Sequence, residues 1–212
     1  MTVYIETIIL YAVIFLSGQV SPVNGGEAAD FSVSLHLARI LMYCIPSLAL
    51  IWYLVIKAKP VKYLGIVPGK ADLLSFALSL PGLLLIGFFI NFASIYLTGE
   101  TAQPLSIPST TAEWVILCAS CIFAACLEES FFRYYILSRR KELRLGAGAA
   151  LFFSVALFSV CHIYQGPWGF LNAVLSGTFL AFLFLRYKAL YGIALAHGVY
   201  NIAAYAVEAW TR

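Results

Sequence analysis

Long apolar stretches alternate with short polar segments along the 212-residue chain. Residues 73–99 contain no Asp, Glu, Lys or Arg, and neither do residues 145–185, which are too many for one membrane helix. A bilayer core needs about 20 apolar residues per helix, and the turn-forming YQGPW at 164–168 divides the second stretch into a helical hairpin. The pattern therefore predicts an all-α fold of about seven transmembrane helices, at residues 3–20, 33–56, 73–98, 113–138, 146–163, 168–186 and 189–209.

Charges in the connecting segments follow the same alternation. Basic residues occur in every second connection: Lys57, Lys59, Lys62 and Lys70, then Arg139, Arg140, Lys141 and Arg144, then Arg186 and Lys188. The other connections carry Glu27, Asp30 and Glu100 and contain no Lys or Arg. Because Lys and Arg are enriched in cytoplasmic loops, we expect a cytoplasmic N-terminus and an outer C-terminus.

The composition favours a membrane protein. Hydrophobic residues make up 62% of the chain and charged residues 11%, with a mean hydropathy of +0.91, whereas a soluble domain carries about 25% charged residues. The net charge of +3 is too small to indicate nucleic-acid binding. We expect a single, multi-pass membrane domain of residues 1–212, and its short length and brief loops are typical of a prokaryotic plasma membrane protein.

The N-terminus and the cysteines change this picture little. No basic region precedes the first apolar run, which contains Glu6, so we interpret residues 3–20 as an uncleaved span rather than a signal peptide. The five cysteines are odd in number and lie in apolar stretches, which argues against a disulfide framework. Cys118 and Cys121 form a CxxC inside a predicted membrane helix, where small packing residues are the simpler interpretation.

Three charged residues lie inside the fourth predicted span. Glu128 precedes Arg139 by eleven residues, about 16 Å along a helix, and a glutamate cannot reach water from that depth. Glu129 and Arg133 are at i and i+4 and can form an ion pair. Glu128 is rotated about 100° from Glu129 and has no partner on its own helix, which suits a general base or acid. The alternative is that all three residues form an ion-pair network that holds helices together.

Two of the three histidines lie in predicted spans near polar or aromatic partners. The segment FSVCH places Phe158 and His162 four residues apart, so the phenyl ring can pack beside the imidazole. The segment HGVYN places His197 and Asn201 on one face of the last span. Polar residues inside a membrane need mutual partners, so we expect these side chains to converge with Glu128 on one interior site.

These residues resemble the motifs of the CAAX protease and bacteriocin-processing (CPBP/Abi) family of glutamate-dependent intramembrane endopeptidases. The family motifs EExxxR, FxxxH and HxxxN are similar to EESFFR at 128–133, FSVCH at 158–162 and HGVYN at 197–201. The resemblance covers residues 113–205 and implies a catalytic core there. The helices of residues 1–112 match nothing specific and are interpreted as a variable N-terminal part.

The resemblance also implies roles for individual residues. Glu128 and His162 would activate the attacking water, and His197 and Asn201 would form an oxyanion site. The remaining motif residues, Glu129, Arg133 and Phe158, would support them. The implied function is hydrolysis of a peptide bond in a membrane-associated protein or peptide, near its C-terminal tail.

Other chemistry stays open at this point. Two histidines and a glutamate are compatible with zinc, but HExxH is absent and the family is described as metal-free, so we expect no cofactor. A non-proteolytic immunity or scaffold protein of the same fold would use the polar cluster for structure alone. A proton-coupled transporter is a third class, although no internal repeat typical of transporters is visible.

Two further features concern substrate binding and the depth of the site in the membrane. His36 and Arg39 lie near the outer end of the second predicted span, either as interfacial residues or as a docking point for a substrate carboxylate. His162 falls close to the outer end of its own span, too shallow to meet Glu128. We therefore expect the turn Gln165–Gly166–Pro167 to remain within the protein rather than reach the outer surface.

Overall fold

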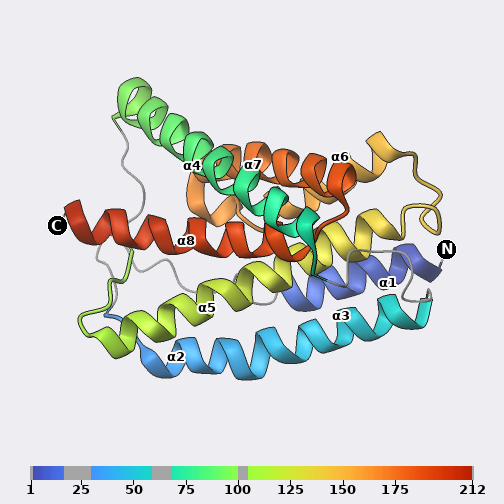
Figure 1. The fold of residues 1–212 in the computed structure, drawn as a ribbon, viewed down its shortest axis with the longest axis horizontal. Helices are drawn as coiled ribbons and strands as arrows, with labels where there is room; N and C mark the ends of the chain where they lie inside the picture. The colour runs from blue at the N-terminus through green and yellow to red at the C-terminus, as the bar shows by residue number, and fades with distance from the viewer. Residues whose placement is uncertain (1, 17–29, 59–67, 100–104, 212) are drawn as a thin grey trace.

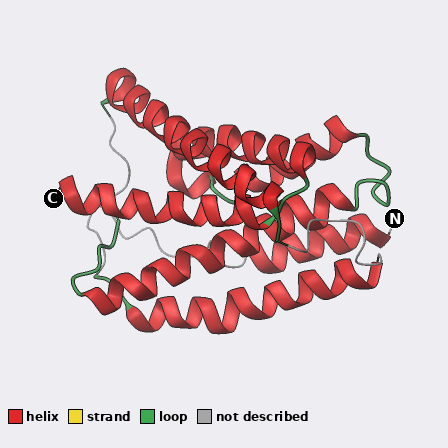
Figure 2. Ribbon diagram, in the orientation of Figure 1, coloured by secondary structure: helices red, strands yellow, loops and turns green. Residues whose placement is uncertain are grey.

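The computed structural model describes residues 2–16, 30–58, 68–99 and 105–211, and every regular element among them is a helix (Figures 1 and 2). The predicted all-α fold is confirmed. In chain order the elements are α1 (Thr2–Tyr11) with the π-helical η1 (Ala12–Leu16); α2 (Val33–Ala38), the π-helical η3 (Arg39–Cys44) and α3 (Ile45–Ala58); α4 (Lys70–Thr98); α5 (Thr111–Glu129) with the π-helical η5 (Ser130–Leu137); α6 (Ala147–Val160); the 3₁₀ turn η6 (Ile163–Gln165); α7 (Gly166–Tyr187); and α8 (Tyr191–Thr211).

Each predicted span contains a helix, although the predicted end of the first span lies outside the described residues. Among the described residues, four helical stretches are long and apolar enough to cross a membrane: Val33–Lys57, Lys70–Thr98, Thr111–Leu137 and Ile163–Tyr187. Two apolar helices, Val3–Leu16 and Ala147–Val160, are shorter. Helix α8 has 21 residues but carries the polar His197 and Asn201. The architecture is that of a helical membrane bundle.

Contacts at the helix ends reproduce the predicted alternation of direction. The Tyr4 hydroxyl donates a hydrogen bond to the Leu143 carbonyl, so the start of α1 lies beside the connection that follows η5. At the opposite end, the Trp168 indole donates to the Thr98 hydroxyl at 3.2 Å, which joins the start of α7 to the end of α4. Figure 1 shows the two chain termini at opposite ends of the molecule. The cytoplasmic location of the N-terminus stays a prediction.

Arg139 stabilises the end of the bundle at which α1 begins. Its guanidinium pairs with Glu6 at 2.6 Å and with Glu142 at 2.8 Å. Burial alone would lower the pKa of Arg139, but the hydrogen bonds to Glu6 and Glu142 outweigh it, so that the pKa is raised above its ordinary value. Glu6 is therefore a partner for the basic loop as well as a residue of the first span.

The start of α5 is defined by a capping box. The Thr110 hydroxyl accepts the Glu113 N–H at 3.3 Å, and the Glu113 carboxylate accepts the Thr110 N–H at 3.1 Å. This reciprocal pair satisfies backbone donors that have no partner inside the helix. Helix α5 continues without a break into η5, and the two form one rod. The η5 part of this rod lies in the interior of the bundle, because all eight of its residues, Ser130–Leu137, are buried.

The outer surface of the bundle is apolar. On α4, for example, Phe88, Phe89, Phe92 and Tyr96 are exposed to 63%, 62%, 58% and 78%. A continuous apolar surface of this kind is rare on a monomeric soluble protein. It is the surface expected of a helix that faces lipid.

The hairpin between α6 and α7 differs from its predicted boundaries. Helix α6 ends at Val160 rather than near residue 163, and α7 begins at Gly166, so Trp168 lies in the helix and not in the turn. Gly166 has φ of +79°, a conformation that favours glycine, and Pro167 occupies the first turn of α7, where its missing N–H costs nothing. The 14 residues of α6 span about 21 Å, less than a bilayer core of about 30 Å.

Candidate active site

The centre of the candidate site is a buried trio formed by Glu129, Arg133 and His197. One Glu129 oxygen lies 3.0 Å from Arg133 Nε, and both side chains are fully buried. The other Glu129 oxygen accepts a hydrogen bond from His197 Nδ1 at 2.9 Å. The ion pair predicted from the i, i+4 spacing is therefore present, and α8 supplies a second partner for the same carboxylate.

Arg133 also connects η5 to two other helices. Its Nη2 donates a hydrogen bond to the Gly177 carbonyl in α7 at 3.3 Å. Its guanidinium lies over the Phe158 ring of α6, 4.6 Å from the ring centroid, a geometry in which cation and ring attract each other. A fully buried cation is thus compensated by a carboxylate, a carbonyl and an aromatic face.

Glu128 points away from this ion pair. Its side chain is 16% exposed, and one carboxylate oxygen lies 3.8 Å from His197 Nε2, too far for a hydrogen bond. That oxygen is itself buried and has no hydrogen-bond partner within the described part of the chain. The predicted division holds in the geometry, since Glu129 is held from two sides and Glu128 is left with a free oxygen.

His197 lies between the two glutamates and has a defined orientation. A carboxylate only accepts hydrogen bonds, so Nδ1 carries the proton that is shared with Glu129. The ring then presents Nε2 to Glu128. A histidine whose one nitrogen is fixed by a carboxylate has the second nitrogen free for chemistry or for binding.

His162 approaches the same region from the end of α6. Its Nδ1 donates to the Phe158 carbonyl at 2.7 Å, because a carbonyl can only accept, and this leaves Nε2 as an acceptor. The Phe158 ring lies 4.5 Å from the His162 ring and 6.1 Å from the His197 ring, measured between centroids. Both imidazoles therefore flank one phenyl ring, which also carries the Arg133 guanidinium.

The remaining predicted residues have fewer contacts. Asn201 lies one turn beyond His197 on α8, and its amide makes no hydrogen bond to any described residue. Arg39 begins η3 and is exposed. His36 stacks on Phe31 with ring centroids 4.6 Å apart, and its Nδ1 is buried without a hydrogen-bond partner among the described residues.

A protein metal site needs several His, Cys, Asp or Glu side chains close together. Across the described residues, no three His, Cys, Asp or Glu side chains are grouped so that they could hold one ion. One nitrogen of His197 is already engaged by Glu129. The expectation that no cofactor is needed stays a prediction.

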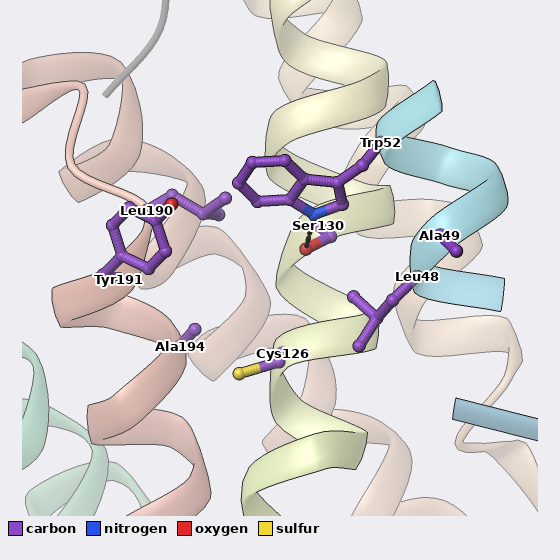
Figure 3. Close-up of a pocket in the computed structure, with 8 residues that line it drawn as sticks. All are labelled: Leu48, Ala49, Trp52, Cys126, Ser130, Leu190, Tyr191 and Ala194. Carbon is purple, nitrogen blue, oxygen red and sulfur yellow. Dashed lines mark hydrogen bonds between the residues drawn. The ribbon is translucent and has the colours of Figure 1, made fainter. Parts of the chain in front are cut away.

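A separate apolar pocket of about 330 Å³ lies between α3, α5 with η5, and the start of α8 (Figure 3). Its floor includes Cys126 and Ser130, and the Trp52 indole donates a hydrogen bond to the Ser130 hydroxyl at 3.1 Å. Cys126 and Ser130 each lie about 160° around the helix from Glu128. The pocket is therefore on the opposite side of the rod from the candidate catalytic carboxylate.

Sequence reasoning missed several partners of the site. Two of them, the Gly177 carbonyl that accepts from Arg133 and the His197 imidazole that pairs with Glu129, lie on segments far from α5 in the chain. The Trp52–Ser130 hydrogen bond of the separate pocket also joins distant segments. Tyr164 was also missed, although its ring stacks on His162 with centroids 6.5 Å apart. Its position two residues after His162, in a turn rich in aromatic residues, is the signal that could have drawn attention to it.

A helical bundle with an apolar outer surface and a buried set of glutamates, arginine and histidines defines an integral membrane protein with an ionisable interior site. The family model for type II CAAX prenyl endopeptidase Rce1-like proteins matches residues 110–203, which include Glu128, His162, His197 and Asn201. The resemblance to the CAAX protease family is confirmed over this part of the chain, and the family is one of membrane-embedded proteases. Searches of curated proteins and of solved structures gave no significant match.

Proposed function

We propose that the protein is an intramembrane endopeptidase in which Glu128 activates a water molecule for attack on a peptide bond. The observation that carries the proposal is the contrast between two adjacent glutamates. Glu129 is neutralised by Arg133 and His197, whereas Glu128 has an oxygen without a hydrogen-bond partner among the described residues and faces Nε2 of His197 at 3.8 Å. The family of residues 110–203 supports a protease in general, and the glutamate mechanism is our own inference.

In the proposed reaction, Glu128 takes a proton from water while the water oxygen attacks the carbonyl carbon of the substrate. The tetrahedral intermediate then collapses, the carbon–nitrogen bond breaks, and the same proton passes to the leaving amine. A general base in this position contributes about 10²- to 10⁴-fold to the rate. His162 offers its free Nε2 as an acceptor that orients the water or shares the proton.

The oxyanion of the intermediate would be stabilised by α8. Asn201 can donate through its amide, which has no other hydrogen bond among the described residues. His197 can donate from Nε2 only when it carries a second proton, because the Nδ1 proton is shared with Glu129. Such donors are worth most where water is scarce. The substrate we propose is a membrane-associated protein or peptide cleaved near its C-terminal tail.

The test compares two matched variants, Glu128→Gln and Glu129→Gln, on a library of membrane-tail peptides in liposomes, with new termini identified by mass spectrometry. Glu128→Gln removes no hydrogen bond to a described residue, so the variant should keep its melting temperature and lose cleavage by about 10²-fold or more. Glu129→Gln leaves the Arg133 charge buried without a carboxylate, which costs about 3–5 kcal/mol, and should lower the melting temperature. If neither wild type nor variant cleaves any peptide while both bind a common partner, the scaffold function replaces ours.

A further inference from the structure

A hydrogen bond between two side chains joins α7 to α8. The Asn172 amide Nδ2 donates to the Tyr200 hydroxyl at 3.2 Å. The two helices pack only lightly on each other, because both pack on α4 and otherwise on different helices, α7 on α6 and α8 on α5 (Figure 1). This pair is therefore a main direct link between α7 and α8.

A third helix limits the position of the Tyr200 hydroxyl. Gly87 in α4 lies so close that a Cβ atom added there would be 2.6 Å from the hydroxyl oxygen. The tyrosine ring is partly buried and packs against the apolar core, which restricts its movement. The hydroxyl is thus held between α4 on one side and Asn172 on the other.

The same two helices hold the buried trio of the candidate active site. On α7, the Gly177 carbonyl accepts a hydrogen bond from Arg133 at 3.3 Å. On α8, His197 shares its Nδ1 proton with Glu129 at 2.9 Å. Because Glu129 and Arg133 are paired on one rod, the geometry of the trio depends on where α7 and α8 lie relative to each other.

The Asn172–Tyr200 bond lies on one side of the trio along both helices. A short connection joins the end of α7 to the start of α8, so the two helices run antiparallel. Asn172 is five residues before Gly177, about 7.5 Å along a helix. Tyr200 is three residues after His197, about 4.5 Å. The bond and the trio therefore close a loop through α7 and α8, and a shift in one displaces the other.

The Asn172 amide also carries an unpaired atom. Its Oδ1 is buried and has no hydrogen-bond partner in the described part of the chain. Rotation of the amide by half a turn would let Tyr200 donate to Oδ1 but would leave the NH₂ group unpaired instead. An unpaired buried polar atom destabilises a fold, whereas an apolar side chain of similar size does not. Stability alone therefore does not explain an asparagine at this position.

We propose that Asn172 and Tyr200 are positioning residues for the proposed hydrolysis, because their hydrogen bond holds α8 in a fixed place relative to α7. The fixed helix keeps Nε2 of His197 directed at Glu128, 3.8 Å away. The proposal rests on the proposed function and adds two residues that do not touch the reacting groups. A misplacement of about 1 Å in such a geometry can cost about 10²-fold in rate.

The experiment uses full-length protein in liposomes, a peptide that wild type cleaves, and three variants: Asn172→Leu, Tyr200→Phe and the double variant. Each should lower kcat about 10- to 100-fold with little change in KM. The double variant should lose no more than the single variants, because all three lack the same bond. Its melting temperature should equal or exceed that of wild type, because both buried polar partners are replaced by apolar groups.

A purely structural contact would behave differently. A melting temperature that falls together with kcat in the double variant would overturn the proposal, and so would additive losses of kcat or a kcat equal to that of wild type. Asn91→Leu and Tyr96→Phe are the matched controls, at exposed positions on α4. They should change neither kcat nor the melting temperature.

A spectroscopic measurement keeps the test independent of catalysis. In wild type labelled with ¹⁵N-histidine, the His197 imidazole should give one sharp set of signals, which disappears in His197→Gln. In the double variant these signals should broaden or split, because α8 no longer has one position. That result without any cleavage by wild type would support the fixing of α8 by the pair and reject the proposed protease activity. Unchanged His197 signals in the double variant would overturn the positioning role.

Discussion

One phenyl ring, that of Phe158, touches the guanidinium and both imidazoles of the candidate active site. It is 2% exposed, and a Cβ atom added at Gly177 would lie 2.8 Å from its Cδ1 atom. Glycine at 177 is therefore required by the ring and not by backbone conformation. The three chemical groups around Phe158 depend on a residue that takes no part in the chemistry.

Gly177→Ala should displace the Phe158 ring and with it the histidines. Overpacking of this kind costs about 1–3 kcal/mol, so we expect a lower melting temperature and about a tenfold loss of kcat. The double variant Gly177→Ala with Phe158→Leu should recover part of the loss, because the smaller side chain makes room for the methyl group. Thermal unfolding and peptide cleavage measure both effects.

Gly148→Ala is the matched control for this substitution, since a Cβ atom there would meet no other atom within 4 Å. It should leave both stability and cleavage unchanged. Additive effects of Gly177→Ala and Phe158→Leu would show that the two sites are independent, and would contradict the assignment.

At the scale of the helices, one carboxylate joins the beginnings of α4 and α8. One oxygen of Asp72 accepts the Gly69 N–H at 3.0 Å, and the other accepts the Gly192 N–H at 3.0 Å. Negative charge is favourable at both of these helix N-termini. Because α8 carries His197 and Asn201, the axial position of these residues depends on Asp72.

Asp72→Ala should remove both hydrogen bonds and lower the free energy of unfolding by about 2–4 kcal/mol. In a chain of this size that corresponds to a drop in melting temperature of about 5–10 °C. Asp30→Ala, which removes an exposed carboxylate elsewhere, should have no effect. Gly192→Ala should lower the free energy of unfolding at least as much, because its Cβ would lie 2.0 Å from the Asp72 carbonyl oxygen. Unchanged melting temperatures of both variants would show that this junction does not stabilise the protein.

At the scale of the whole molecule, the depth of the α6–α7 turn determines where the site lies in the bilayer. Helix α6 is shorter than the apolar core, and His162 lies two residues beyond its end. The turn should therefore lie below the outer surface, close to the level of Glu128. Irregular backbone at such depth is tolerated where protein or water covers it.

Cysteine labelling can locate the turn in a background without the native cysteines. Gln165→Cys is preferable to a cysteine at Gly166, whose positive φ would be strained by a side chain. Ser109→Cys should label rapidly from the outside and Lys141→Cys only after permeabilisation, whereas Gln165→Cys should label slowly from either side. Rapid outside labelling of Gln165→Cys would place the turn at the surface and contradict the prediction.

Local sequence patterns predicted the positions of the helices and the part of the candidate site that lies on α5 and η5. The apolar runs gave the helix positions, and the i, i+4 spacing gave the Glu129–Arg133 pair and the rotation of Glu128 away from it. The second partner of Glu129 could not be found in this way, because His197 lies 68 residues later and the bond depends on how α8 packs against α5. The same holds for Asp72, which lies just before the predicted span of residues 73–98 and whose partner Gly192 is 120 residues away.

The separation between Glu129 and His197 has a consequence for biogenesis. Translation delivers α5 to the insertion machinery long before the segment with His197 leaves the ribosome. During that interval Arg133, on the same helix, is the partner that lets a carboxylate enter the lipid phase. The salt bridge therefore neutralises the Glu129 carboxylate while the new helix enters the membrane. His197 adds its hydrogen bond only when the later segment arrives.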